Sequence, residues 1–192
     1  MEGHQGHRFH PDKADKLLND ERKESLPFDK VIEIMDLGPH DVVADLGAGN
    51  GYFTIPIANH TKGTVYAIDI EPKMLEILKK RANDERIENI RYVISDIDHT
   101  QIEDQSIDQV LISWVLHEVP SIENTLTEIK RILKPGGTVL FIEWEAIETE
   151  DGPPFHIRIP SEKLVQILEN DGFETTLYRL NPVNYALKGK LS

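Results

Sequence analysis

The sequence predicts an α/β fold: a doubly wound, mostly parallel sheet of seven strands, with helices on both faces and an antiparallel last strand. From residue 42 onward, short apolar or β-branched runs alternate with segments that are apolar at helical spacing. This alternation is typical of βαβ units, whose strands pair in parallel. The last two apolar runs are joined only by Asn181–Pro182, which predicts an antiparallel hairpin.

The individual elements follow from these patterns. The expected strands are 42–46, 64–69, 90–95, 107–113, 138–143, 173–180 and 182–188. The expected helices are two within 13–37, then 52–60, one opened by Pro72, one capped by Ser121, and 161–171. Lys134-Pro135-Gly136-Gly137 ends the helix that follows Ser121. Together they describe a Rossmann-like architecture, in which ligands bind outside the carboxyl ends of the strands.

Composition excludes several classes of function. The chain has 192 residues, 21 Lys and Arg against 34 Asp and Glu, a net charge of −13 and no Cys. The absence of Cys excludes disulfides, thiolate metal sites and a Cys nucleophile. The acidity, with five acids and no base within 143–151, disfavours a nucleic-acid partner. No apolar run is long enough to span a membrane and the N-terminus is polar, so we expect a cytoplasmic protein without a membrane partner.

A glycine-rich bend follows the first expected strand and opens the next helix. It reads Asp45-Leu46-Gly47-Ala48-Gly49-Asn50-Gly51-Tyr52. Glycines here let the backbone turn tightly and approach a ligand closely. Asp69 lies 22 residues after Gly47, at the end of the second strand, where an acid can accept both hydroxyls of an adenosine ribose. The combination predicts a nucleoside-containing cofactor.

Two classes of cofactor share this arrangement. A dinucleotide site has a third glycine at the position of Tyr52, and the pyrophosphate would meet the negative charge of Asp45. The same charge attracts a ligand that carries an ammonium and a sulfonium. The bend therefore favours S-adenosylmethionine over NAD.

The chain resembles the class I S-adenosylmethionine-dependent methyltransferases over roughly residues 30–190. Asp45 to Gly51 matches that family's first motif, [DE]-x-G-x-G-x-G, and Ser95-Asp96-Ile97 matches its third-strand motif. Leu133-Lys134-Pro135-Gly136-Gly137 is a further familiar element, and the family's last strand is antiparallel. The resemblance implies a single methyltransferase domain over 1–192. Its N-terminal arm and helical lid cover 1–37, and its catalytic α/β core covers 38–192.

The resemblance also implies roles for individual residues. Around the methionine and ribose parts of the cofactor it places Asp45, Gly47, Ala48, Gly49, Asn50, Gly51, Asp69 and Ser113. Around the adenine it places Ile70, Met74, Asp96 and Ile97. Simpler interpretations stay open for three of them: Asp69 as a helix N-cap, Asp96 as the cap of a turn, and Met74 as a core residue.

His117 is the strongest candidate for a general base, because it follows the fourth strand in the loop that borders the methyl group. A structural, hydrogen-bonded histidine is the alternative, and Glu118, Glu143 and His156 are weaker candidates. We expect no metal, although His4, His7 and His10 are spaced three apart.

The predicted function is methyl transfer from S-adenosylmethionine to a small-molecule acceptor, by a monomer or homodimer. The acidic rim favours a neutral or cationic acceptor. Quinone C-methyltransferases look similar, but their first motif is usually D-x-A-x-G-T-G, from which Asn50–Gly51 departs. The alternatives are a nicotinamide-dependent oxidoreductase and a cofactor-binding module without catalysis.

Overall fold

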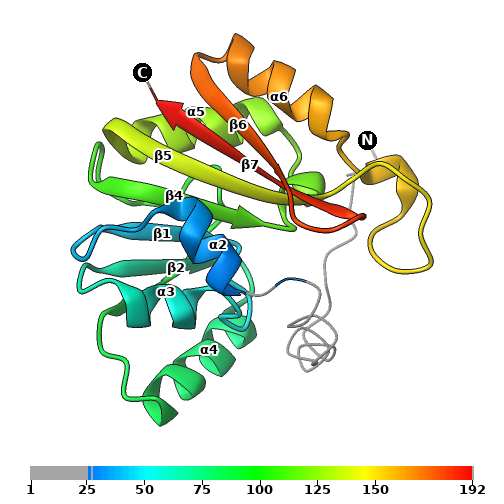
Figure 1. The fold of residues 1–192 in the computed structure, drawn as a ribbon. Helices are drawn as coiled ribbons and strands as arrows, with labels where there is room; N and C mark the ends of the chain where they lie inside the picture. The colour runs from blue at the N-terminus through cyan, green and yellow to red at the C-terminus, as the bar shows by residue number, and fades with distance from the viewer. Residues whose placement is uncertain (1–25, 27, 192) are drawn as a thin grey trace, which may run out of the picture.

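The computed structural model describes Leu26 and residues 28–191, which form one sheet with helices on both faces (Figure 1). The strands are β1 (Val43–Leu46), β2 (Val65–Asp69), β3 (Ile90–Ile94), β4 (Ile107–Ser113), β5 (Leu133–Trp144), β6 (Phe173–Arg179) and β7 (Asn184–Leu191). Their order across the sheet is β3-β2-β1-β4-β5-β7-β6, and β7 alone runs antiparallel to its neighbours. The predicted seven-stranded sheet and its antiparallel last strand are confirmed.

The strand order reverses between β1 and β4. From β1 the chain moves outward to β2 and β3, and then returns to form β4 on the other side of β1. The loops that follow β1 and β4 therefore diverge from one point at the carboxyl edge of the sheet. In a doubly wound sheet this switch point is where a ligand finds room between the loops.

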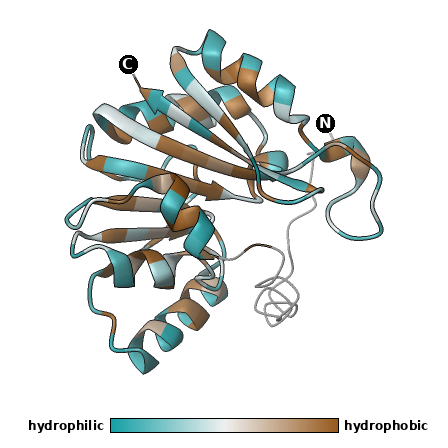
Figure 2. Cartoon of the chain, viewed as in Figure 1, coloured by the Kyte–Doolittle hydropathy of each residue, from teal (hydrophilic) through white to brown (hydrophobic). Residues whose placement is uncertain are grey.

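The helices cover both faces of the sheet. They are α2 (Phe28–Met35), α3 (Thr54–His60), α4 (Pro72–Asp84), α5 (Ile122–Ile132) and α6 (Ser161–Asn170), with two short 3₁₀ turns, η2 (Leu116–Glu118) and η3 (Phe155–Ile157). Side chains of α2, α3 and α4 join one apolar cluster, and those of α5 and α6 join another. Val43 belongs to the first cluster and Ala44 to the second, as alternation along a strand requires. Figure 2 shows the strands as mainly hydrophobic and the outer sides of the helices as mainly hydrophilic.

The Lys134-Pro135-Gly136-Gly137 segment lies within β5, and not between a helix and a strand as expected. Helix α5 ends at Ile132, and Leu133 already pairs with Ile107. Regular pairing resumes at Thr138 after a register shift, so the proline and glycines form an irregular stretch of a strand longer than predicted. Lys134 Nζ anchors this stretch to the carboxylate of Asp108 at 2.7–2.8 Å.

Helix α2 belongs to the segment 1–37 that is expected to form an arm and lid, of which residues 1–25 and 27 lie outside the described residues. Val31 and Met35 of α2 are buried in the first apolar cluster. Lys188 of β7 donates to the carbonyl oxygens of Ile34 and Met35 at 2.9 Å each, which satisfies acceptors that the end of a helix leaves open. Helix α2 is thus packed against the core, and the role of residues 1–37 as a lid stays a prediction.

A buried carboxylate joins the segment after β3 to α5. Glu128 accepts from the backbone N–H and hydroxyl of Thr100 at 2.7 Å each, and pairs with Arg131 at 2.7–2.8 Å. Burial alone would raise the pKa of Glu128, but the bonds from Arg131 and Thr100 outweigh it and lower the pKa to about 2. Its stabilising contribution is therefore complete above the usual pKa of 4.5 and is lost as the pH falls toward 2.

We expect Glu128→Gln to lower the free energy of unfolding by about 1–3 kcal/mol at pH 7, since the amide loses the charged bonds to Arg131. The difference between variant and wild type should shrink as the pH falls below 4. Urea unfolding at several pH values measures both. A difference that stays constant down to pH 2 would contradict the role of the ionised carboxylate.

Two negative observations concern the described residues alone. No helix within Leu26 and 28–191 has the length and apolarity that a membrane crossing needs. The same residues contain no group of three or more His, Cys, Asp or Glu side chains arranged to hold a metal ion. His4, His7 and His10, at which we expected no metal, lie outside this part of the chain.

Candidate functional site

The glycine bend lies at the switch point and closes over the end of β2. The backbone N–H groups of Gly47 and Ala48 both donate to the carbonyl oxygen of Ile68, at 2.8 and 2.9 Å. Gly47, Gly49 and Gly51 all have positive φ angles, of 80°, 53° and 83°, a conformation that strongly favours glycine. The sequence therefore needs glycine at every second position of this bend for conformational reasons alone.

The three glycines differ in what surrounds them. A Cβ on Gly47 would lie 2.4 Å from Val115 Cγ2, and one on Gly51 would lie 2.0 Å from Leu78 Cδ1. A Cβ on Gly49 would meet nothing within 4 Å. Gly47 and Gly51 are thus also required for packing, whereas Gly49 borders open space at the carboxyl edge of the sheet.

Asp69 faces this open space from the end of β2. Its Oδ2 accepts the N–H of Gly49 at 2.8 Å, and its Oδ1 accepts the N–H of Glu71 at 2.9 Å. The N-cap of α4 is Glu71, which accepts from Lys73 N, so Asp69 is not the helix cap. Burial, with the nearby charge of Glu71, raises the pKa of Asp69 even though hydrogen bonds from the backbone of Glu71, Gly49 and Ile70 oppose it. Each carboxylate oxygen keeps a second lone pair for a ligand hydroxyl.

The carboxylate of Asp45 is buried, and one of its two oxygens has no hydrogen-bond partner among the described residues. Its side chain is 1% exposed, and Oδ2 accepts from the hydroxyl of Thr54 at 2.6 Å. Oδ1 is buried without a hydrogen-bond partner in the described part of the chain. Burial raises the pKa of Asp45 to about 7, against the Thr54 bond and with help from the charge of Asp69. Because an unsatisfied buried carboxylate oxygen is costly, a cationic donor brought by a ligand fits this position.

The predicted adenine residues surround the neighbouring ends of β2 and β3. Ile70 is 44% exposed, whereas Met74 and Ile97 are buried, and Met74 belongs to neither apolar cluster of the described residues. Asp96 is exposed, and its backbone carbonyl oxygen accepts from the N–H of His99 at 3.2 Å. These four residues provide apolar surfaces and one accessible acceptor.

Asn50 and Ser113 complete the predicted set. Asn50 is buried, and its carbonyl oxygen accepts from Arg81 of α4, which fixes the far side of the glycine bend. Ser113 ends β4, opposite Ile142 of β5. The next residue, Trp114, has a φ of 56°, a strained backbone for a bulky side chain. That turn directs the chain into η2.

His117 in η2 is paired with Glu143 of β5. His117 Nδ1 lies 2.8 Å from Glu143 Oε2, and the backbone N–H of His117 donates to Glu143 Oε1 at 3.3 Å. The side chain of His117 is 5% exposed and that of Glu143 is fully buried. Burial alone would lower the pKa of His117, but the bond and charge of Glu143, together with Glu118, raise it despite the opposing charge of Arg158.

The pairing of His117 with Glu143 was not predicted, although both residues were candidates. A signal was present: each residue follows or ends a strand, and β4 and β5 are neighbours whose ends are in register at Ser113 and Ile142. His156, by contrast, is an exposed residue of η3. The structure brings together His117, Glu143 and Glu118, and His156 is an exposed residue of a different turn.

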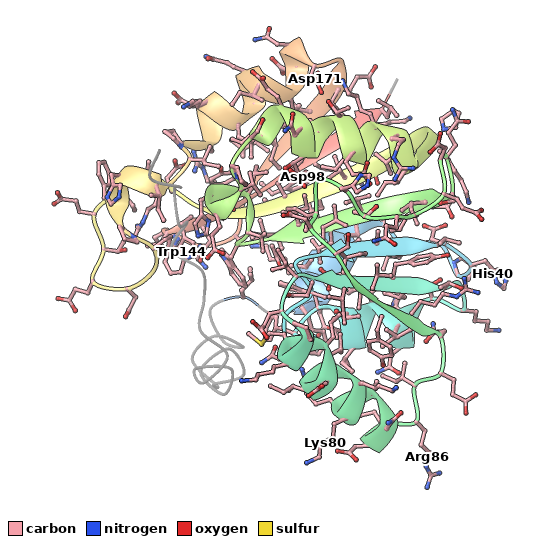
Figure 3. All side chains as sticks on the ribbon, turned by 180° about the vertical axis from the view of Figure 1, so that it is seen from behind. His40, Lys80, Arg86, Asp98, Trp144 and Asp171 are labelled. Atoms are coloured by element: carbon pink, nitrogen blue, oxygen red, sulfur yellow. The ribbon has the colours of Figure 1, made fainter. Side chains whose placement is uncertain are left out.

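Two arginines from elsewhere in the chain contact the acidic segment 143–151, one through a carboxylate and one through backbone oxygens. Glu145 pairs with Arg179 and accepts from Ser161 Oγ at 2.7 Å. The buried guanidinium of Arg158 donates to backbone oxygens across residues 147–153 and lies 5.2 Å from the centre of the Trp144 ring. Figure 3 shows Trp144 at the carboxyl edge of the sheet and His40, which precedes β1, at the opposite edge. The rim is thus less uniformly acidic than predicted.

Comparison with known proteins defines the class of protein. Residues 44–141 match the methyltransferase-domain family Methyltransf_11. This stretch contains the glycine bend, Asp69, Asp96 and His117, and the chain therefore belongs to that family of methyltransferase domains.

Individual relatives share about a third of their residues with this chain over part of their length. The ubiquinone/menaquinone biosynthesis C-methyltransferase UbiE of Bartonella henselae is 32% identical, over 76% of this chain and 65% of its own length. The demethylmenaquinone methyltransferase of Tropheryma whipplei is 31% identical, over 67% of this chain and 53% of its own. The chain thus spans less than two thirds of these relatives. A SAM-dependent methyltransferase structure from Aquifex aeolicus shares the fold, with a TM-score of 0.88 at 24% identity over 96% of this chain and all of the other.

Proposed function

We propose that the protein transfers a methyl group from S-adenosylmethionine to a small-molecule acceptor. The observation that carries the proposal is the Oδ1 of Asp45, which is buried without a hydrogen-bond partner in the described part of the chain, at the start of a glycine bend that leaves open space at Gly49. An ammonium group satisfies that oxygen, whereas a pyrophosphate would bring negative charge toward Asp45 and Asp69. The same charges argue against a nicotinamide dinucleotide, and no observation favours a module without catalysis.

The residues divide between the parts of this cofactor. Asp45, Gly47, Ala48, Gly49 and Ser113 would border the methionine portion, and Asp69 would hold the ribose hydroxyls. Ile70, Met74, Asp96 and Ile97 would border the adenine. Asn50 and Gly51 would help to hold the bend against α4, since the backbone carbonyl oxygen of Asn50 accepts from Arg81 and a Cβ on Gly51 would meet Leu78.

The chain's own contribution to the reaction is alignment, exclusion of water and proton removal. When bound, S-adenosylmethionine supplies a methyl group on a positively charged sulfur, which is a good leaving group. His117 is held by Glu143 through Nδ1, so Nε2 is the nitrogen that would accept a proton from the acceptor.

The acceptor would be a small neutral or cationic molecule, because Glu118 and Glu143 both face His117. Two relatives are named as a C-methyltransferase of ubiquinone/menaquinone biosynthesis and as a demethylmenaquinone methyltransferase, although Asn50–Gly51 departs from the usual first motif of quinone C-methyltransferases. A cytoplasmic location and a monomeric or dimeric state remain predictions.

Calorimetry with S-adenosylmethionine, S-adenosylhomocysteine and NAD tests the cofactor directly. We expect saturable binding of the first two and none of NAD. Incubation with isotope-labelled donor and a metabolite extract, followed by mass spectrometry, then identifies any compound that gains one methyl group. Binding of NAD alone would contradict the proposal.

We expect Asp69→Ala to weaken binding of S-adenosylhomocysteine by ~1–3 kcal/mol, because the charged acceptor for the ribose hydroxyls is lost. Glu71→Ala is the matched control: it removes the neighbouring acid and the cap of α4, and should leave the affinity close to wild type. Calorimetric dissociation constants for both variants measure the effect. Equal affinities of Asp69→Ala and wild type would remove the ribose assignment.

A further inference from the structure

We propose that a cavity between α2, α3 and α4 is a second binding site, for a small zwitterion of the α-amino-acid type with an apolar side chain, and that its occupation strengthens cofactor binding. The cavity lies on the side of the sheet that these three helices cover (Figure 1). The binding site itself does not depend on the methyltransferase function proposed above, whereas the effect on the cofactor rests on it.

The first argument is the size of the cavity and its apolar wall. Its volume is about 360 Å³, within the range of about 300–1,000 Å³ that is typical of ligand pockets. Phe28 and Ile32 of α2 and Ile55 of α3 contribute to the apolar wall. The aromatic side chain of Phe28 is 41% exposed, so the wall offers apolar surface that a ligand can remove from water.

The second argument is a cation in the cavity wall that pairs with no acid. Within the described residues, the guanidinium of Arg81 donates one hydrogen bond, to the neutral carbonyl oxygen of Asn50, and forms no ion pair. Burial lowers the pKa of Arg81 although the charge of Glu85 opposes it, because partial compensation does not outweigh the loss of water. A guanidinium carries several N–H donors in a planar fork that matches a carboxylate. The donors that Asn50 does not use can therefore bind the carboxylate of a ligand.

The third argument is the acids beside this cation, which distinguish a zwitterion from a simple anion. Glu85 lies four residues after Arg81, one helical turn further along, and both line the cavity together with Asp29 of α2. Glu85 is also the C-cap of α4, where the end of a helix favours positive charge. A simple anion would meet both acids. A zwitterion instead presents its carboxylate to Arg81 and its ammonium group to Glu85.

The cavity is connected to the candidate cofactor site through the glycine bend. Arg81 donates to the carbonyl oxygen of Asn50 within the bend, and Tyr52 at the end of the bend lines the cavity. A Cβ on Gly51 would lie 3.4 Å from Cγ1 of the cavity residue Ile55. A carboxylate that fixes the guanidinium of Arg81 would therefore also hold the bend in the shape that the structure shows. Because coupling between two sites is reciprocal, bound cofactor must strengthen binding of the zwitterion by the same factor.

Calorimetry with three related probes tests the chemistry of the site. L-Phenylalanine carries both charges, 3-phenylpropionate lacks the ammonium group, and 2-phenylethylamine lacks the carboxylate. We expect saturable one-to-one binding of L-phenylalanine to the full chain, and binding of the other two that is at least about tenfold weaker, since each loses one charged contact. No saturable binding of L-phenylalanine overturns the site. Equally tight binding of either of the other probes overturns the zwitterion class.

Variants test whether the binding takes place in this cavity. Arg81→Met should weaken binding of L-phenylalanine by at least about tenfold, whereas Glu85→Gln should weaken binding of L-phenylalanine without weakening that of 3-phenylpropionate. Lys80→Met is the matched control, because it removes a cation from an exposed position of α4 outside the cavity lining, and should bind as wild type does.

Phe28→Ala keeps the bond between Arg81 and Asn50 and tests the apolar wall independently. It should weaken binding of L-phenylalanine by about fivefold, since it removes the aromatic contact. Thermal unfolding shows whether each variant is folded. Unchanged affinity in a folded Arg81→Met or in Phe28→Ala, or an equal loss in Lys80→Met, overturns the assignment of the site to this cavity.

Calorimetry with both ligands tests the coupling and separates this inference from the proposed function. With saturating L-phenylalanine we expect S-adenosylhomocysteine to bind about fivefold more tightly, and the converse titration should give the same factor. Displacement of one ligand by the other overturns the second site, and equal affinities with and without the partner ligand overturn the coupling. A protein that binds L-phenylalanine and not S-adenosylhomocysteine would contradict the proposed function and, with it, the coupling, but would support the second site. Binding of S-adenosylhomocysteine without binding of L-phenylalanine would contradict this inference alone.

Discussion

Asp45→Asn is expected to stabilise the ligand-free protein at pH 8 and, at the same pH, to weaken its binding of S-adenosylmethionine. Folding raises the pKa of Asp45 from 3.8 to about 7. Below pH 3.8 the group is protonated in both folded and unfolded states. Between these values the folded state holds a proton that the unfolded state has lost, so this group's contribution to stability falls as the pH rises toward 7 and is lost above it.

The asparagine variant avoids this loss, because its amide stays neutral and its oxygen still accepts from Thr54. The gain over wild type should be near zero at pH 4 and reach about 2–4 kcal/mol at pH 8. The loss of binding follows from the loss of the charge that faces the ligand's ammonium, and should be at least about tenfold.

Urea unfolding at pH 4 and pH 8, and calorimetry at pH 8, measure the two effects. Asp108→Asn is the matched control, since the carboxylate of Asp108 is fully partnered by Lys134 Nζ and Val42 N and its loss should destabilise the protein. Lower stability of Asp45→Asn at pH 8 would show that the carboxylate is well compensated without a ligand. That result would remove the observation on which the cofactor proposal depends.

The second large effect is a contrast between two glycines of the same bend. Gly49→Val should fold and lose cofactor binding, because its Cβ enters space that no residue fills and that the ligand needs. Gly51→Ala should destabilise the protein by about 2–4 kcal/mol, since its Cβ would lie 2.0 Å from Leu78 Cδ1 at a positive φ. The smaller side chain thus causes the larger loss of stability.

Thermal unfolding and calorimetry separate these outcomes. Gly136→Val is the control for backbone strain, because Gly136 also has a positive φ, of 76°, and open surroundings, but lies in β5. It should match Gly49→Val in stability and wild type in binding. Retained binding by Gly49→Val would mean that the open space at the bend is not the cofactor site.

Local patterns were sufficient for most of the fold. The strands of the sheet were found within a few residues because apolar runs that end in turns have few other conformations available. The error in β5 arose at Lys134-Pro135-Gly136-Gly137, where composition typical of a turn is accommodated as an irregular strand. There, pairing with β4 and the bond between Lys134 and Asp108 outweigh local preference.

The candidate site also combines features that local sequence predicts with features that it does not. The bend from Asp45 to Gly51, Asp69 and His117 could each be predicted as candidates from residue type and spacing, because a close backbone approach favours glycine and an acid at a strand end can accept hydroxyl groups. Two features could not be predicted from local sequence. One is that a Cβ would clash with neighbouring side chains at Gly47 and Gly51 but not at Gly49. The other is the hydrogen bond between His117 and Glu143, which are 26 residues apart.

The sequence by itself determined that this chain forms a doubly wound sheet with a glycine bend and an acid at its carboxyl edge, because those properties depend on periodicity and on the conformational freedom of single residues. Only the tertiary structure decided which carboxylate oxygens find hydrogen-bond partners among the described residues and which, such as Asp45 Oδ1, do not. Burial and partner distance set that outcome, and both arise when strands far apart in the chain are brought side by side.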